Sequence, residues 1–192
     1  MHIEVVNEMA RGIKEADSGR HLMTFHPNGY RSSSFHLHDE EWLDFNMIQT
    51  SHSQQNLDSY NFIKSDYERL PIKPTLDGEP RYEDHAINFR AENGYFDDFD
   101  VRQAAYWAVF AGAFGHTYGH SCIWCMCTEQ TDSRIMHWKA ALNRPGATQM
   151  KYLTKLMESR PVLERVPDHE LLAENYPKAN HQQATRGNDY AF

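Results

Sequence analysis

The sequence predicts an α/β protein built from consecutive strand–helix units around a parallel sheet. Three observations predict this class: short apolar segments alternate with amphipathic helical segments, turn residues separate them, and polar residues gather where the expected strands end. The 192 residues hold about four such units. Four units make half of a (β/α)8 TIM barrel, which needs about 250 residues, and a smaller open sheet fits the same length. Periodicity leaves both architectures open.

Each element has a local signal in the sequence. Ile3, Val6 and Ala10 recur at helical spacing, and Asp100 with Gln103 has the spacing of a helix capping box. The expected strands cover residues 21–26, 43–50, 74–79 and 115–119, and the expected helices cover residues 3–16, 57–67, 100–114 and 150–157. The second and third strands are each followed by a helix that leads to the next strand, as parallel pairing requires.

Composition and charge exclude several function classes. The formal net charge of -8 argues against a nucleic-acid surface, because phosphate binding needs clustered Lys and Arg. The longest apolar run, 104–114, is far shorter than the roughly 20 residues that cross a bilayer. The sequence has no Gly-x-Gly-x-x-Gly motif and no phosphate-binding loop, so no nucleotide cofactor is expected.

Polar and aromatic residues follow every expected strand. They are His26 after the first strand, Gln49 and His52 after the second, Glu79, Arg81 and Tyr82 after the third, and Tyr118, His120 and Trp124 after the fourth. In parallel α/β proteins the chemistry lies at the carboxyl ends of the strands. Carboxylates, amides and aromatic faces together suit a sugar site, where acids act on the glycosidic bond and rings pack on the sugar.

Each of these residues also has a structural interpretation. Glu79 can pair with Arg81, His26 and His52 can fill space at a strand end, and Trp124 can pack in a core. The sequence favours catalysis for Glu79 and sugar stacking for Trp124, and leaves the two histidines evenly balanced.

Three cysteines suggest a metal site as an alternative. Cys122, Cys125 and Cys127 lie within six positions, close to His116 and His120. Their odd number and clustering exclude a disulfide framework across the chain. Zinc needs four ligands in a tetrahedron, but the two histidines lie on an expected strand and loop, where residues four apart do not converge. No metal is therefore expected, although a small zinc module at 122–127 stays as an alternative.

Several segments together resemble the apiosidase-like glycoside hydrolases, family 140 and its relatives. The segments are Thr-Phe-His-Pro at 24–27, Trp-Leu-Asp-Phe-Asn-Met-Ile-Gln-Thr-Ser-His at 42–52, Leu-Asp-Gly-Glu-Pro-Arg-Tyr-Glu at 76–83, the helix pieces at 100–102, 105–107 and 110–113, and Gly-His-Thr-Tyr-Gly-His at 115–120. They keep the order of the family and extend to about residue 160.

The resemblance implies the last four βα units of a (β/α)8 barrel over residues 1–160, with Glu79 as the nucleophile of a retaining glycosidase. It implies an oligosaccharide or polysaccharide substrate of the pectic class. Residues 161–192 are expected to be a linker and the beginning of a following β domain. Export is expected of such proteins, although the N-terminus has no signal-peptide pattern.

The same resemblance implies that this chain is incomplete. The partner acid/base of the family is an Asp in a Gly-Gly-Asp motif, and no such motif occurs in the sequence. It is expected upstream of Met1. A half barrel exposes sheet edges and core, so the chain alone is expected to be unstable or oligomeric. A non-catalytic carbohydrate-binding remnant is the second alternative.

Overall fold

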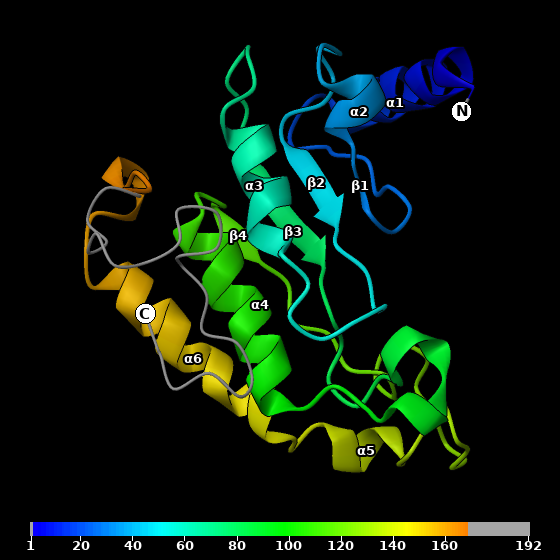
Figure 1. Ribbon diagram of the computed structural model, residues 1–192. Helices are drawn as coiled ribbons and strands as arrows, with labels where there is room; N and C mark the ends of the chain where they lie inside the picture. Colours follow the sequence, from blue (N-terminus) through cyan, green and yellow to red (C-terminus); the bar gives the residue numbers. More distant parts are fainter. Residues whose placement is uncertain (1, 169–192) are drawn as a thin grey trace.

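A computed structural model describes residues 2–168 of the protein. It contains a four-stranded sheet in the order β1-β2-β3-β4, flanked by helices (Figure 1). The strands are β1 (Arg31–Ser32), β2 (Asn46–Gln49), β3 (Thr75–Glu79) and β4 (Gly115–His116). The pairs β2–β3 and β3–β4 are parallel, whereas β1 runs antiparallel to β2. The parallel part of the predicted sheet is therefore present.

Helices connect the parallel strands and cover one face of the sheet. The α-helices are α1 (Ile3–Asp17), α2 (Ser34–Leu37), α3 (Ser59–Tyr67), α4 (Asp98–Phe110), α5 (Trp138–Ala141) and α6 (Pro145–Glu158). Short 3-10 helices lie at η1 (Ile87–Phe89), η2 (Ala91–Asn93) and η3 (Val162–Glu164). In Figure 1, α4 lies beside both α3 and α6. The order β2-α3-β3-α4-β4 is two consecutive parallel crossovers, as in a partial TIM-barrel-like fold.

The main core joins the sheet to α3 and α4. Ile48 of β2 packs with Tyr60 and Ile63 of α3 and with Trp107 and Ala108 of α4. Ile48 and Ile63 are fully buried. A second cluster joins α4 to α6 through Ala105, Val109 and Leu153. The continuous apolar run of α4 is thus explained, because this helix packs on the sheet and on both neighbouring helices.

Helix α4 begins earlier than the sequence predicts. Its N-cap is Asp97, whose carboxylate accepts from the backbone N–H groups of Phe99 and Asp100, while the Asp100 carboxylate accepts from the Asp97 N–H at 3.0 Å. The capping box is therefore Asp97 with Asp100, and the predicted pair of Asp100 with Gln103 is wrong. The helix ends at Phe110, shortly before Gly112 at φ 116°.

The predicted strand at 21–26 is not a strand. This segment is extended, but its one backbone–backbone hydrogen bond runs from Asp44 N to Met23 O at 2.9 Å. Thr24 Oγ1 donates to the Phe45 carbonyl, and the Asp44 carboxylate accepts from Met23 N. The adjacent edge of β2 is occupied by Arg31 and Ser32 of β1, so a continuous ladder with 21–26 does not form.

The expected C-terminal β domain falls mostly outside the described residues. Residues 161–168 contain η3, and residues 169–192 lie beyond the part that the structure describes. No helix within residues 2–168 is long and apolar enough to span a bilayer.

Candidate active site

Glu79 lies at the carboxyl end of β3, beside the end of β2. The strand register has an irregularity at this point, so that Gln49 pairs with Glu79 and Gly78 is passed over. Gln49 Nε2 donates to Glu79 Oε1 at 2.8 Å, and the Thr50 backbone N–H donates to the Glu79 carbonyl at 3.1 Å. The bulge thus aims the carboxylate and holds its backbone.

Two histidines complete the contacts of the Glu79 carboxylate. His26 Nε2 lies 2.8 Å from Oε2, and His52 Nε2 lies 3.1 Å from Oε1. The hydrogen bond with His52 is the main reason that the pKa of Glu79 is lowered, with the charges of His52 and His26 acting in the same direction and burial opposing them. His26 Nδ1 donates to the Pro27 carbonyl at 2.9 Å, because a carbonyl can only accept.

The Glu79 carboxylate is therefore both ionised and accessible. Its side chain is 21% exposed, although three side chains hold it. An ionised carboxylate in fixed orientation, open to solvent on one side, has the properties of a nucleophile. The structure brings together four of the predicted site residues: Glu79, His26, Gln49 and His52.

Aromatic rings extend this site beyond the carboxylate. The Tyr82 ring lies 4.6 Å from the His52 ring. Burial and the charge of Glu79 raise the pKa of Tyr82 to about 12. The His85 ring stacks on His52 at 4.4 Å, and burial lowers its pKa to about 4, so it is neutral. Phe89 packs edge-on against both histidine rings.

His85 and Phe89 were not among the predicted site residues. Their sequence signal was weak, because they follow β3 by six and ten positions, in a segment without strand or helix periodicity. Asn88 N donates to the His52 carbonyl at 2.8 Å and folds this segment back over the end of β2. That return is a tertiary contact, which local patterning does not encode.

Two predicted site residues belong to a separate buried network around Glu83 and Asp84. Tyr118 donates its hydroxyl hydrogen to Glu83 Oε2 at 2.6 Å, and the Gly146 N–H donates to Glu83 Oε1 at 3.1 Å. His120 Nδ1 accepts from a backbone N–H at 2.9 Å, so His120 Nε2 is the donor to Asp84 Oδ2 at 3.0 Å. Arg144 also donates to Asp84. The structure gives Tyr118 and His120 the geometry of packing and support, not of an open sugar contact.

Arg81 lies beneath the site. It is 1% exposed, and its guanidinium carbon lies 5.8 Å from the centre of the Trp107 ring. Burial lowers its pKa to about 10, against the raising effect of the Asp100 and Asp77 charges. The fully buried Asp77 has a pKa raised to about 7, mainly by burial. Arg81 thus cannot reach a sugar without a rearrangement of the core.

Trp124 lies on the loop after His120 and is 61% exposed. Arg134 lies over its ring, with the guanidinium carbon 5.1 Å from the ring centre. The charge of Arg134 also contributes to the lowered pKa of His85, which relates this loop to the aromatic rings beside Glu79. Stacking of a sugar on Trp124 stays a prediction.

The zinc alternative finds no support within residues 2–168. No group of three or more His, Cys, Asp or Glu side chains in that part of the chain is arranged to hold a metal ion. Cys122 is buried, whereas Cys127 Sγ donates to the Glu129 carbonyl and Cys125 Sγ to the Ser121 carbonyl.

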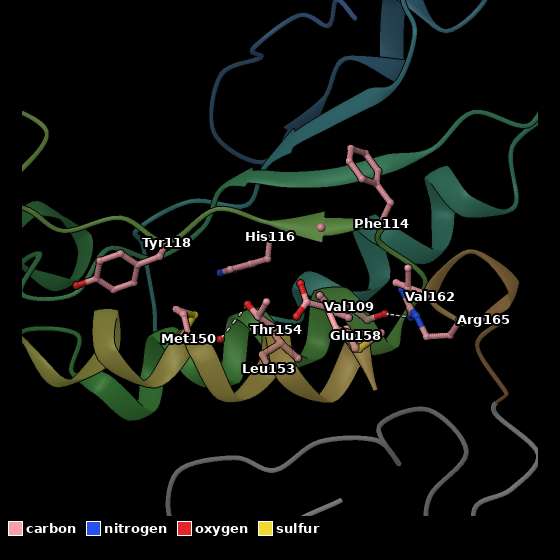
Figure 2. Close-up of a pocket in the computed structure, with 12 residues that line it drawn as sticks. Val109, Phe114, His116, Tyr118, Met150, Leu153, Thr154, Glu158, Val162 and Arg165 are labelled. Atoms are coloured by element: carbon pink, nitrogen blue, oxygen red, sulfur yellow. Dashed lines mark hydrogen bonds between the residues drawn. The ribbon is translucent and has the colours of Figure 1, made fainter. Parts of the chain in front are cut away.

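A cavity of about 290 Å³ lies between β4 and helices α4 and α6, away from Glu79. Figure 2 shows His116 pointing from β4 toward these helices, with Leu153 and Thr154 of α6 facing it. Burial lowers the pKa of His116 to about 3, so the imidazole is neutral. The cavity is lined mainly by the packing side chains of the helix layer and holds no carboxylate–histidine pair like that of Glu79.

Several known proteins resemble this chain in sequence and in fold. The family model described as apiosidase-like, catalytic domain, matches residues 1–164. A solved structure described as a glycoside hydrolase is 37% identical, with a TM-score of 0.83 over 90% of this chain and 43% of that one. A glycoside hydrolase family 5 structure from Bacteroides vulgatus ATCC 8482 is 37% identical, with a TM-score of 0.86 over 93% of this chain and 42% of that one. The chain thus spans less than half of these structures. No curated protein sequence gives a significant match.

Proposed function

Since the chain belongs to the apiosidase-like catalytic-domain family, we propose that it supplies the nucleophile and part of the substrate site of a retaining glycoside hydrolase. The observation that carries the proposal is the Glu79 carboxylate, which is ionised, partly exposed and held by Gln49, His26 and His52 at the ends of β2 and β3 and in the loop before β1. This position, at the carboxyl ends of parallel strands, is where barrel enzymes carry their catalytic groups.

In the proposed reaction, a Glu79 oxygen attacks the anomeric carbon while the bond to the leaving oxygen breaks. A second carboxyl group, about 5–5.5 Å away, protonates that leaving oxygen and later removes a proton from the water that releases the sugar. The hydrogen bonds from Gln49 and His52 keep Glu79 charged and fixed before the attack. We propose that the acid/base comes from a part of the barrel that this chain does not contain.

The proposed substrate class is a pectic oligosaccharide or polysaccharide, as the family suggests. His26, Gln49, His52, Tyr82 and Trp124 remain proposed substrate contacts. Arg81, Tyr118 and His120 are proposed instead to support the loops, because they are buried or bonded into the Glu83–Asp84 network.

The test places the chain in a complete barrel. In a chimaera, it replaces the matching 42% of the Bacteroides vulgatus hydrolase. Glu79→Gln is expected to lower kcat on pectic oligosaccharides by about 10⁴-fold or more. Glu68→Gln, at an exposed ion pair on the helix layer, is the matched control and leaves kcat unchanged. Full activity of the Glu79→Gln chimaera would remove Glu79 from the mechanism.

Azide distinguishes a nucleophile from an acid/base. Glu79→Gly leaves room for azide, which then displaces an activated aryl leaving group directly and yields a glycosyl azide of inverted anomeric configuration. A product of retained configuration would make Glu79 the acid/base instead. Saturable sugar binding without turnover by the unmutated chimaera would favour the carbohydrate-binding alternative.

A further inference from the structure

Phe89 is an exposed aromatic ring at the edge of the Glu79 site. It is 69% exposed, although its ring centre lies 4.8 Å from that of His85 and 6.0 Å from that of His52. Both contacts are edge-to-face, with interplanar angles of 87°. Its remaining surface is apolar and open to solvent.

The backbone that presents this ring is strained. Asn88 and Phe89 both lie in the left-handed region, at φ 54° and 61°, which bulky L-residues rarely adopt. The bonds from Asn88 N to the His52 carbonyl and from Phe89 N to the Ala86 carbonyl hold this conformation. Such backbone outliers concentrate at ligand sites.

The ring lies one side chain away from the reacting carboxylate. His52 contacts Phe89 on one side, while its Nε2 lies 3.1 Å from Glu79 Oε1. A sugar bonded to the unit attacked by Glu79 would extend past His52 toward this ring. Aromatic faces bind sugars through the apolar C–H face of the pyranose or furanose, and Phe89 carries no polar group that would orient it otherwise.

We propose that Phe89 is the stacking platform of a second sugar subsite, which makes the site select oligosaccharides over monosaccharides. The identity of the ligand rests on the proposed glycoside hydrolase function. The position of the subsite rests on the packing of Phe89 against His52 and His85. Trp124 is a less suitable platform, because the Arg134 guanidinium already lies over its ring.

The experiment measures binding without turnover, in the chimaera carrying Glu79→Gln. Calorimetric titration with pectic mono-, di- and trisaccharides compares Phe89→Ala and Phe89→Tyr. Phe89→Ala is expected to weaken trisaccharide binding about tenfold while leaving monosaccharide binding unchanged, and Phe89→Tyr to retain affinity for both.

Phe35→Ala is the matched control, because it removes another exposed phenyl ring. Phe35 lies on α2, whose C-cap His38 contacts Asn46 at the far end of β2 from Gln49. Unchanged trisaccharide affinity in Phe89→Ala, or an equal loss for all sugar lengths, would overturn the subsite. If the chimaera with Glu79 intact binds but does not hydrolyse, the proposed reaction fails while the length-dependent effect of Phe89 still decides the subsite.

Discussion

Glu79 and Glu83 are four residues apart, and each accepts hydrogen bonds from side chains or backbone, yet they lie in opposite environments. Glu79 contacts His26, Gln49 and His52 and keeps 21% of its side chain exposed. Glu83 contacts Tyr118 and the N-terminus of α6 and is fully buried. Both residues are glutamates, so the difference between them is in solvent exposure and not in side-chain chemistry. A carboxylate that is fixed by hydrogen bonds but exposed to solvent can act on a ligand, whereas one that is fixed and buried stabilises the fold.

The largest expected difference between the two carboxylates is in stability. Glu83→Ala leaves the partly buried Tyr118 hydroxyl and the helix-terminal N–H of Gly146 without their acceptor, and is expected to lower the free energy of unfolding by about 3–5 kcal/mol. Glu79→Ala, at a partly exposed site, is expected to change it by less than about 1 kcal/mol. Urea denaturation of both variants measures the contrast. Equal losses would mean that Glu79 is also mainly structural.

A pH titration sharpens the comparison within β3. Asp77 is buried, with a pKa raised to about 7 from 3.8, so the folded state keeps a proton that the unfolded chain releases. The free energy of unfolding should therefore fall as the pH rises from about 4 to about 7, by an order of 2–4 kcal/mol. Asp77→Asn should flatten this dependence, and urea midpoints between pH 4 and 8 measure it. A wild-type midpoint that rises over that range would contradict the burial argument.

Gly119→Ala tests whether the segment after β4 can disturb the Glu79 site. A Cβ at position 119 would overlap the Tyr82 ring, and Tyr82 packs on His52. The expected cost is about 1–3 kcal/mol in unfolding free energy, together with a lower kcat as His52 moves away from Glu79. Gly12→Ala is the control, because nothing lies within 4 Å of its Cβ and a helix-interior Ala should add about 0.5–1 kcal/mol. Thermal melts and the chimaera assay together report both effects.

The smallest expected effect is a shift in a pH–rate profile. His52 supplies the main hydrogen bond that lowers the pKa of Glu79. His52→Phe keeps a ring stacked beside His85 but removes that donor, so the pKa of Glu79 should rise. The acid limb of kcat/KM in the chimaera should then move to higher pH. His36→Phe, at an exposed position on α2, should leave the limb in place, and an unmoved limb in His52→Phe would count against this role.

The sequence predicted the elements whose packing is local and regular. The helices α1 and α3 and the strand β3 agree closely with their predicted segments. Helix α6 is present but begins at Pro145, five residues before the predicted segment 150–157. The predicted start of α4 was wrong because Asp97 and Asp100 are both suitable N-cap residues, and only the structure shows that Asp97 is the N-cap. Segment 21–26 has the composition of a strand, but a strand also needs a free neighbouring edge, and β1 occupies it.

The candidate site was predictable to the extent that strand ends converge. Gln49 and His52 meet Glu79 because the parallel strands β2 and β3 end at the same edge of the sheet. His26 reaches the same carboxylate from the segment before β1, which is not a strand. Tyr118 and His120 end strands or loops as well, but Arg144 and Gly146, far along the chain, enclose the carboxylates that they contact. The position of a residue in the sequence indicates at which edge of the sheet its side chain lies. Long-range packing decides whether that side chain is exposed to solvent.

The bond from Gly146 N to Glu83 spans 63 residues, and that from Arg144 to Asp84 spans 60. During synthesis at about 5–20 residues per second, residue 83 leaves the ribosome roughly 3–13 s before residue 146 does. For that interval the two acids of the nascent chain lack these two partners, although Tyr118 and His120 emerge earlier. The last step of its folding is therefore expected to wait for α6, and ribosome-bound chains arrested before residue 144 should be cleaved by protease near residues 83–84.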